Sequence, residues 1–264
     1  YPPFSFLVMK WLGKDSCYVV MGEYGRECDW IGVVSLHAIF VINIALTIWT
    51  FWKIDRKTVL PRSIALSAGL PMLYTLERGN ILLLTFTFML LAYGPIVRSA
   101  WARWIFAGMM VNLKVYLVAL LLAPLLRRKW RAVEGATIAT IVIYMASWAL
   151  FGVGSPVEFV SSVMSYGSGF GAGSPLDLWY PVTYIPLLSL LNNGTFAVSS
   201  FIDTRTLELT ALFVSLYVNL GRLMILGAIL AVWLRPEVVP AHRVLYLPLA
   251  FALLNSEAGG YTQI

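Results

Sequence analysis

The strongest constraint on this chain is a series of apolar runs, some of them long enough to cross a lipid bilayer. A helix that crosses the hydrocarbon core needs about 20 predominantly apolar residues. Trp30–Trp52 and Leu207–Leu234 reach that length. Val115–Leu126 is apolar on every face, whereas the strands of a transmembrane barrel alternate apolar and polar residues. We therefore predict an all-α, polytopic bundle of transmembrane helices.

The overall composition excludes the main alternatives. Apolar residues make up 59% of the 264 positions and charged residues 12%, whereas a soluble domain carries about 25% charged residues. A water-soluble globular enzyme is therefore excluded, and two cysteines are too few for a disulfide scaffold. The net charge of +6 does not indicate a nucleic-acid partner, because Lys and Arg gather in the cytoplasmic loops of membrane proteins.

The ends of the chain suggest a piece of a longer protein. The sequence begins at Tyr1 without a signal peptide and ends at Ile264, inside an apolar stretch that starts at Val244. We interpret 1–264 as one membrane domain and an internal fragment. A first helix with its outer loop, and further C-terminal helices, are expected to be missing from it.

Several apolar segments are shorter than a full span. Phe4–Leu12 is expected to lie at the membrane interface, where Trp residues are enriched. Ser63–Leu76 and Ile81–Val97 are expected to be tilted, kinked or buried in the bundle. Gly135–Phe151 is predicted to be another helix, and Gly152–Tyr184 a long outer loop rich in Gly and Ser.

The basic residues orient these segments. Four loops, at 53–62, 98–103, 127–134 and 235–243, hold twelve of the nineteen Lys and Arg residues but only three acids. The positive-inside rule therefore places these four loops in the cytoplasm.

This orientation puts both ends of Trp104–Leu126 on the same side of the membrane. We therefore predict a broken helical hairpin, interrupted near Asn112 and Lys114. Irregular backbone at membrane depth is tolerated only where it is buried in protein or lines a cavity. The alternative is one ordinary span with one loop that violates the charge rule.

Two cations lie near the middle of apolar segments. Lys114 and Arg222 are too far from a segment end to reach water easily. Each can belong to a pocket for a phosphate or pyrophosphate, because Arg offers a bidentate fork and Lys a point charge. The alternative is structural ion pairing, for which Glu77 and Glu257 are the candidate partners.

Other polar features leave two interpretations open. Glu77-Arg78-Gly79-Asn80 can hold an anionic head group or sugar hydroxyls, or it can be a solvated turn between helices. Cys17 and Cys28 lie in an outer loop and can form a disulfide or remain free thiols. His37 and Asn43 are expected to form interhelical hydrogen bonds.

Several short motifs together resemble the polyprenyl-phosphate-sugar glycosyltransferases of family 87, members of the GT-C class. The motifs that carry the resemblance are Tyr1-Pro2-Pro3, Leu76-Glu77-Arg78-Gly79-Asn80, Asn112-Leu113-Lys114-Val115-Tyr116, Arg127-Arg128-Lys129-Trp130-Arg131, Asn192-Asn193-Gly194-Thr195, and Leu254-Asn255-Ser256-Glu257 with Tyr261. The resemblance is strongest over 77–131. The sequence departs from the family at Val115, where Pro is usual, and at Gly260, where a His often precedes the Tyr.

The resemblance implies a GT-C-like fold and transfer of a hexose, with mannose favoured, from a polyprenyl-phosphate donor. The acceptor would be a lipid or glycan on the extracytoplasmic side of the cell membrane. Arg78 and Lys114 are the expected ligands of the donor phosphate, and a general base is expected upstream of Tyr1. The residues expected to line the site are Glu77, Asn80, Tyr116, Arg222 and Glu257. No metal and no cofactor is expected besides the lipid-linked co-substrate.

Two other functions remain open at this point. A membrane transporter or flippase for lipid-linked sugars would also use buried cations and broken helices. An O-antigen polymerase or ligase would share the compartment and the lipid-linked substrates.

Overall fold

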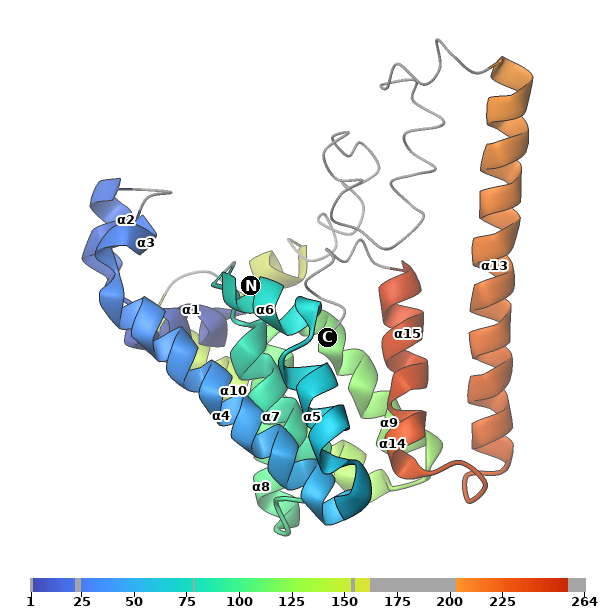
Figure 1. Cartoon of the computed structure of the whole chain (residues 1–264), viewed down its shortest axis with the longest axis horizontal. Helices are drawn as coiled ribbons and strands as arrows, with labels where there is room; N and C mark the ends of the chain where they lie inside the picture. The colour runs from blue at the N-terminus through green and yellow to red at the C-terminus, as the bar shows by residue number, and fades with distance from the viewer. Residues whose placement is uncertain (1, 22–24, 78, 153–154, 162–202, 256–264) are drawn as a thin grey trace. The chain divides into compact units, whose positions relative to one another are not determined.

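The computed structural model describes residues 2–21, 25–77, 79–152, 155–161 and 203–255. The described residues form helices joined by turns, without a strand among them, which confirms the all-α prediction (Figure 1). The elements are α1 (Pro3–Leu12), α2 (Asp15–Met21), α3 (Gly25–Cys28), α4 (Trp30–Ile54), η2 (Arg56–Thr58), α5 (Val59–Ser67), α6 (Leu70–Glu77), α7 (Leu82–Tyr93), α8 (Ala100–Leu113), η3 (Val115–Leu121), α9 (Leu122–Leu126), α10 (Trp130–Phe151), α13 (Thr204–Leu234), α14 (Ala241–Val244) and α15 (Tyr246–Asn255).

Among the described residues, two helices, α4 and α10, are long and apolar enough to cross a membrane. α13 has 31 residues, and its apolar part runs over Asn219–Leu234. The predicted run at 63–76 is divided into α5 and α6 by Ala68 and Gly69. α10 begins five residues before the predicted Gly135, and a helical turn at 156–161 interrupts the predicted loop at 152–184. The rest of that loop lies outside the described residues.

The helices cluster into two compact units, and each is described by itself. The first unit comprises Tyr1–Leu121 and Trp130–Gly154, and the second comprises Leu122–Lys129 and Ser155–Gln263.

Within the first unit, α4 and α7 run parallel. The amide of Asn43 donates to the carbonyl of Leu83 over 2.7 Å and accepts from the hydroxyl of Thr87 over 2.7 Å. Seven residues further along α4, Thr50 faces Gly94 at the end of α7. Asn43 therefore makes the interhelical bonds expected of it. His37, by contrast, contacts the carbonyl of Val33 in its own helix, so the interhelical prediction for His37 is wrong.

α7 and α8 are antiparallel neighbours. The guanidinium of Arg103 donates to the carbonyls of Ala92 and Gly94, over 2.8 and 3.1 Å. The rings of Phe88 and Phe106 stack with centroids 5.9 Å apart. Arg103 thus supplies donors and positive charge to carbonyls at the C-terminal end of α7.

α8 and α10 are close and parallel. Gly135 of α10 lies against the indole of Trp104, and Gly108 of α8 lies against Ala139 and Thr140. A Cβ added at Gly108 would come within 2.9 Å of the backbone there, so this close approach requires glycine. Two parallel helices must start at the same end of the unit, so the segment between them turns back. The interruption at Lys114 lies where the sequence predicts it, and the return of the chain agrees with the predicted hairpin, whose place in a membrane stays a prediction.

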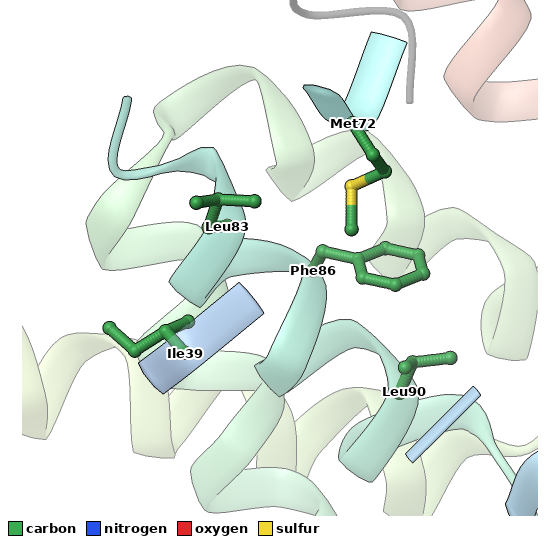
Figure 2. Close-up of a cluster of buried hydrophobic side chains, with 5 residues drawn as sticks. All are labelled: Ile39, Met72, Leu83, Phe86 and Leu90. Atoms are coloured by element: carbon green, nitrogen blue, oxygen red, sulfur yellow. The ribbon is translucent and has the colours of Figure 1, made fainter. Parts of the chain in front are cut away.

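These directions define two ends of the first unit. The basic end holds the end of α4, η2, and the starts of α8 and α10. The Lys114 end holds the start of α4, the turn between α6 and α7, and the end of α8. Between them lies an apolar cluster that joins α4, α6 and α7, in which Met72 reaches toward the ring of Phe86 (Figure 2). Its buried members are Ile39, Met72, Leu83, Phe86 and Leu90.

The second unit packs α9, α13, α14 and α15 around Ala123, Leu126, Val232 and Val244. Two residues after the end of α9, Arg128 has a positive φ (54°). Its guanidinium donates to the carbonyl of Trp233 over 3.2 Å and lies 5.6 Å from the centroid of that indole ring. The contact with the end of α13 offsets a backbone conformation that is unfavourable for a residue other than glycine.

Candidate functional site

Lys114 lies where α8 is interrupted. α8 ends at Leu113, Lys114 adopts an extended conformation (φ −143°, ψ 108°), and the chain continues as a 3-10 helix. The side chain of Lys114 is only 9% exposed. Lys114 follows the C-terminus of α8, where the partial negative charge of the helix dipole favours a cation. The buried cation predicted from the sequence is therefore present, and the backbone around it is fixed.

Two polar side chains hold the backbone beside Lys114. The hydroxyl of Ser5, from α1, is within 3.0 Å of the carbonyl of Asn112 and 3.1 Å of that of Leu113. The amide of Asn112 donates to the carbonyls of Gly108 and Thr140, both over 2.9 Å, and so ties the end of α8 to α10. Carbonyls at the end of a helix need such partners when they are buried. Ser5 and Asn112 therefore determine where the chain departs from the helix.

α1 covers this end of the first unit. Val8 of α1 packs with Ile81 and Leu113 in one apolar cluster, and Phe6 stacks on Phe151 at the end of α10 with ring centroids 5.6 Å apart. Trp11 remains 70% exposed, which fits the interfacial position expected for this segment. The contact between Ile81 and Leu113 brings the turn at 78–81 and the Lys114 backbone to the same end.

The motif at 77–80 forms the junction between α6 and α7. Gly79 has φ 63°, its N–H donates to the carbonyl of Leu76, and the N–H of Asn80 donates to that of Thr75. This is the Schellman arrangement, in which glycine takes the left-handed position after a helix. The side-chain oxygen of Asn80 then accepts the N–H of Leu82, the first residue of α7, over 3.1 Å.

The junction between α6 and α7 has a structural role that does not depend on substrate binding. Glu77 is exposed at the end of α6. Arg78, the other predicted phosphate ligand, lies outside the described residues, so its role stays a prediction. Asn80 is expected to line the site; its side-chain oxygen accepts the N–H of Leu82, and its role in binding stays a prediction.

The remaining site predictions fall into three groups. Tyr116 lies two residues after Lys114, on η3, and is half-buried. Arg222 belongs to α13 in the second unit, where its guanidinium donates to the side-chain oxygen of Asn219 over 3.1 Å. Glu257, the motif at 192–195 and Tyr261 lie outside the described residues.

Sequence reasoning missed Asp29, a buried carboxylate at the start of α4. It is 1% exposed and accepts the N–H of Gly32 (2.9 Å), the N–H of Lys14 (3.0 Å) and the hydroxyl of Tyr18 (3.0 Å). These bonds connect α2 and the preceding turn to α4. A polar residue directly before an apolar run is the usual helix N-cap signal, so the sequence did contain a clue.

A disulfide joins Cys17 of α2 to Cys28 of α3, with Cα atoms 5.6 Å apart. Of the two possibilities left open by the sequence, the structure therefore has the disulfide. The cross-link lies immediately before α4, beside Asp29. In the part of the chain that the structure describes, no group of three or more His, Cys, Asp and Glu residues could hold a metal ion.

The chemistry available at the Lys114 end is anion binding. A buried Lys ammonium attracts an anion more strongly than one in water, because the effective dielectric constant is lower. The site is the place where three segments meet: α1, residues 79–81 before α7, and the interrupted helix.

A comparison with protein families finds a match to the model described as glycosyltransferase family 87, over residues 1–256. The matched region contains α1, residues 79–81 before α7, the Lys114 interruption and Arg222. No curated protein and no solved structure matches the chain.

Proposed function

The chain belongs to glycosyltransferase family 87, and we propose that it transfers a hexose, with mannose favoured, from a polyprenyl-phosphate donor to a lipid or glycan acceptor. The family establishes that the protein is a glycosyltransferase, which decides among the three functional classes left open by the sequence. The donor, the sugar and the side of the membrane are our proposals.

We place the Lys114 end on the extracytoplasmic side of a multi-pass bundle in the cell membrane. Two observations support this orientation. The basic end carries Lys53, Arg56, Arg98 and Arg131, as the positive-inside rule requires of a cytoplasmic face. The Cys17–Cys28 disulfide precedes α4 at the opposite end, and disulfides persist in oxidising compartments outside the cytoplasm.

The proposed reaction is a displacement at the anomeric carbon of the donor sugar. A hydroxyl oxygen of the acceptor forms the new glycosidic bond, and the bond from the anomeric carbon to the donor phosphate oxygen breaks with its electron pair. The acceptor proton passes to a general base, and the departing polyprenyl phosphate gains negative charge. A cation aimed at that oxygen stabilises the transition state more than the bound donor, which raises the rate.

Lys114 is the residue that we assign to this role, with Arg78 as its expected partner. The observation that carries the assignment is the burial of the Lys114 side chain at a helix interruption, at the same end as the turn that bears Arg78. Tyr116, Glu77 and Asn80 are proposed to lie around the same site. Arg222 and Glu257 remain expected site residues on the basis of the family resemblance.

The test is transfer from synthetic polyprenyl-phosphate mannose by the full-length protein in vesicles. Lys114→Met keeps the length and apolar character of the side chain and removes its charge, so we expect kcat to fall about 100-fold or more. Lys114→Arg should retain part of the activity. Lys10→Met, an exposed lysine of α1, is the matched control and should leave kcat unchanged. Activity of Lys114→Met within about twofold of wild type would refute the assignment.

A further inference from the structure

The basic end of the first unit carries an arrangement of cations and aromatic rings that glycosyl transfer does not require. Lys53 Nζ lies 5.1 Å from the centroid of the Trp49 ring, and the guanidinium of Arg56 lies 5.2 Å from that of Trp52. The guanidinium of Arg62, on α5, lies 5.9 Å from the ring of Phe51. Three cations within ten residues are therefore each held over an aromatic face.

The cations are not neutralised by acids of the same segment. Residues 53–62 contain four cations and one acid, Asp55, so their net charge is +3. The carboxylate of Asp55 accepts the hydroxyl of Thr58 over 2.7 Å and the backbone N–H of Lys57 over 3.0 Å. These bonds, with a smaller contribution from Arg62, lower the pKa of Asp55. Asp55 therefore acts as a turn residue that closes α4 and starts η2.

The surroundings of the cations are apolar and exposed. Trp49 is 51% and Trp52 53% exposed, and Leu60 and Ile64 of α5 are exposed as well. An aromatic and cationic belt at the end of a 25-residue apolar helix lies at the level of lipid headgroups. A guanidinium that rests on a ring still has N–H donors at its edge, and their geometry matches a phosphate.

We propose that Lys53, Arg56 and Arg62 form a binding site for the headgroup of an anionic bilayer phospholipid. The phosphate would accept hydrogen bonds from the two guanidinium edges, and the acyl chains would lie along the exposed apolar surface of α4 and α5. Cation–π contacts pre-organise the side chains, so little conformational entropy is lost when the lipid binds. This proposal does not depend on the proposed sugar transfer, because it concerns the opposite end of the unit from Lys114.

The test measures quenching of tryptophan fluorescence in the full-length protein by brominated lipids. The protein is reconstituted in phosphatidylcholine vesicles that contain a small fraction of brominated phosphatidylglycerol or of brominated phosphatidylcholine. We expect the association constant obtained from quenching to be about five-fold higher for phosphatidylglycerol than for phosphatidylcholine. One favourable cation contact at the membrane surface gives this factor. Equal quenching by the two lipids would overturn the proposal.

Two variants separate a built site from diffuse surface charge. The triple variant Lys53→Gln, Arg56→Gln, Arg62→Gln should abolish the preference for phosphatidylglycerol. The matched triple variant Arg98→Gln, Lys129→Gln, Arg131→Gln removes the same charge from other exposed positions and should retain it. If both variants lose the preference for phosphatidylglycerol equally, the preference comes from diffuse surface charge and the proposed site is refuted.

Two further measurements test the guanidinium geometry and the identity of the bound lipid. If the first triple variant does not fold, Arg56→Lys with Arg62→Lys keeps the charge and should lower the preference because the planar, bidentate group is lost. If the preference for phosphatidylglycerol is unchanged in that variant, the phosphate does not bind through the planar guanidinium groups. Polyprenyl monophosphate should not displace phosphatidylglycerol at equal concentration, and displacement would assign the site to the carrier lipid instead.

Discussion

Replacing Ser5 by alanine tests whether α1 holds Lys114 in place. The hydroxyl of Ser5 is fully buried and is shared between the carbonyls of Asn112 and Leu113, at the point where α8 stops. Ser5→Ala removes that donor and leaves buried carbonyl groups unsatisfied, which costs about 1–3 kcal/mol. If this cost falls on the conformation that positions Lys114, the population of the competent state decreases by a factor of about 5 to 150.

The assay combines thermal unfolding in detergent with steady-state transfer kinetics. We expect Ser5→Ala to lower the unfolding temperature and to lower kcat more than it raises KM for the donor, because the leaving phosphate gains charge only in the transition state. Ser5→Thr retains the hydroxyl and should recover a large part of both quantities. Ser161→Ala is the control: its exposed hydroxyl donates to Glu158 over 2.9 Å, and its loss should change neither.

Two results would refute this reasoning. One is unchanged stability and kinetics in Ser5→Ala, which would mean that the carbonyls find other partners. The other is a decrease in Ser5→Thr as large as that in Ser5→Ala, which would mean that side-chain volume and not the hydroxyl matters at this position.

Three other predictions follow from the same structure. Gly79→Ala should destabilise the protein by about 1 kcal/mol in thermal unfolding, because the φ of Gly79 is 63°. Steric contact contributes little, since only Leu36 lies near a Cβ added there. An equal loss of stability in Gly79→Asn would contradict the explanation by left-handed backbone. Asp29→Ala should lower the free energy of unfolding by about 1–3 kcal/mol and expose the segment before α4 to protease, because three donors lose their acceptor. Wild-type stability in this variant would show that the buried carboxylate is not needed. Cysteines placed at Arg98 and Lys129 should both react with a membrane-impermeant maleimide from the cytoplasmic side only, and labelling from opposite sides would refute the return of the chain between α8 and α10 in the membrane.

The features that the sequence predicts best are those set by charge and hydropathy. The break at Lys114 and the return of the chain were predicted because both flanking loops are basic, a rule that needs no knowledge of tertiary contacts. The run at 63–76 was expected to be tilted, kinked or buried because it is short, and its division into α5 and α6 agrees with a kink. Asn43, an amide in an apolar helix, indicated an interhelical hydrogen bond, and the structure contains it.

The features that the sequence did not predict depend on residues distant in the chain. Ser5 and the carbonyl of Asn112 are separated by 107 residues, and a single serine in an apolar segment carries no signal of such a contact. His37 has the same polar character as Asn43 but finds its partner one turn back in its own helix. Asn80, which is expected to line the site, also accepts the N–H of Leu82 through its side-chain oxygen, a local contact that was not predicted from the sequence. Local pattern identifies polar groups that need partners, while the packing decides which partners they find.

The proposed donor and the role of Lys114 can be tested together by measuring sugar transfer by the full-length protein in vesicles supplied with one donor at a time. We expect that mannose from polyprenyl-phosphate mannose reaches the acceptor, that a nucleotide-linked mannose without the lipid does not replace it, and that Lys114→Met abolishes the transfer. Transfer from the nucleotide-linked sugar alone, or transfer from the lipid-linked sugar that is insensitive to Lys114→Met, would refute the proposed function.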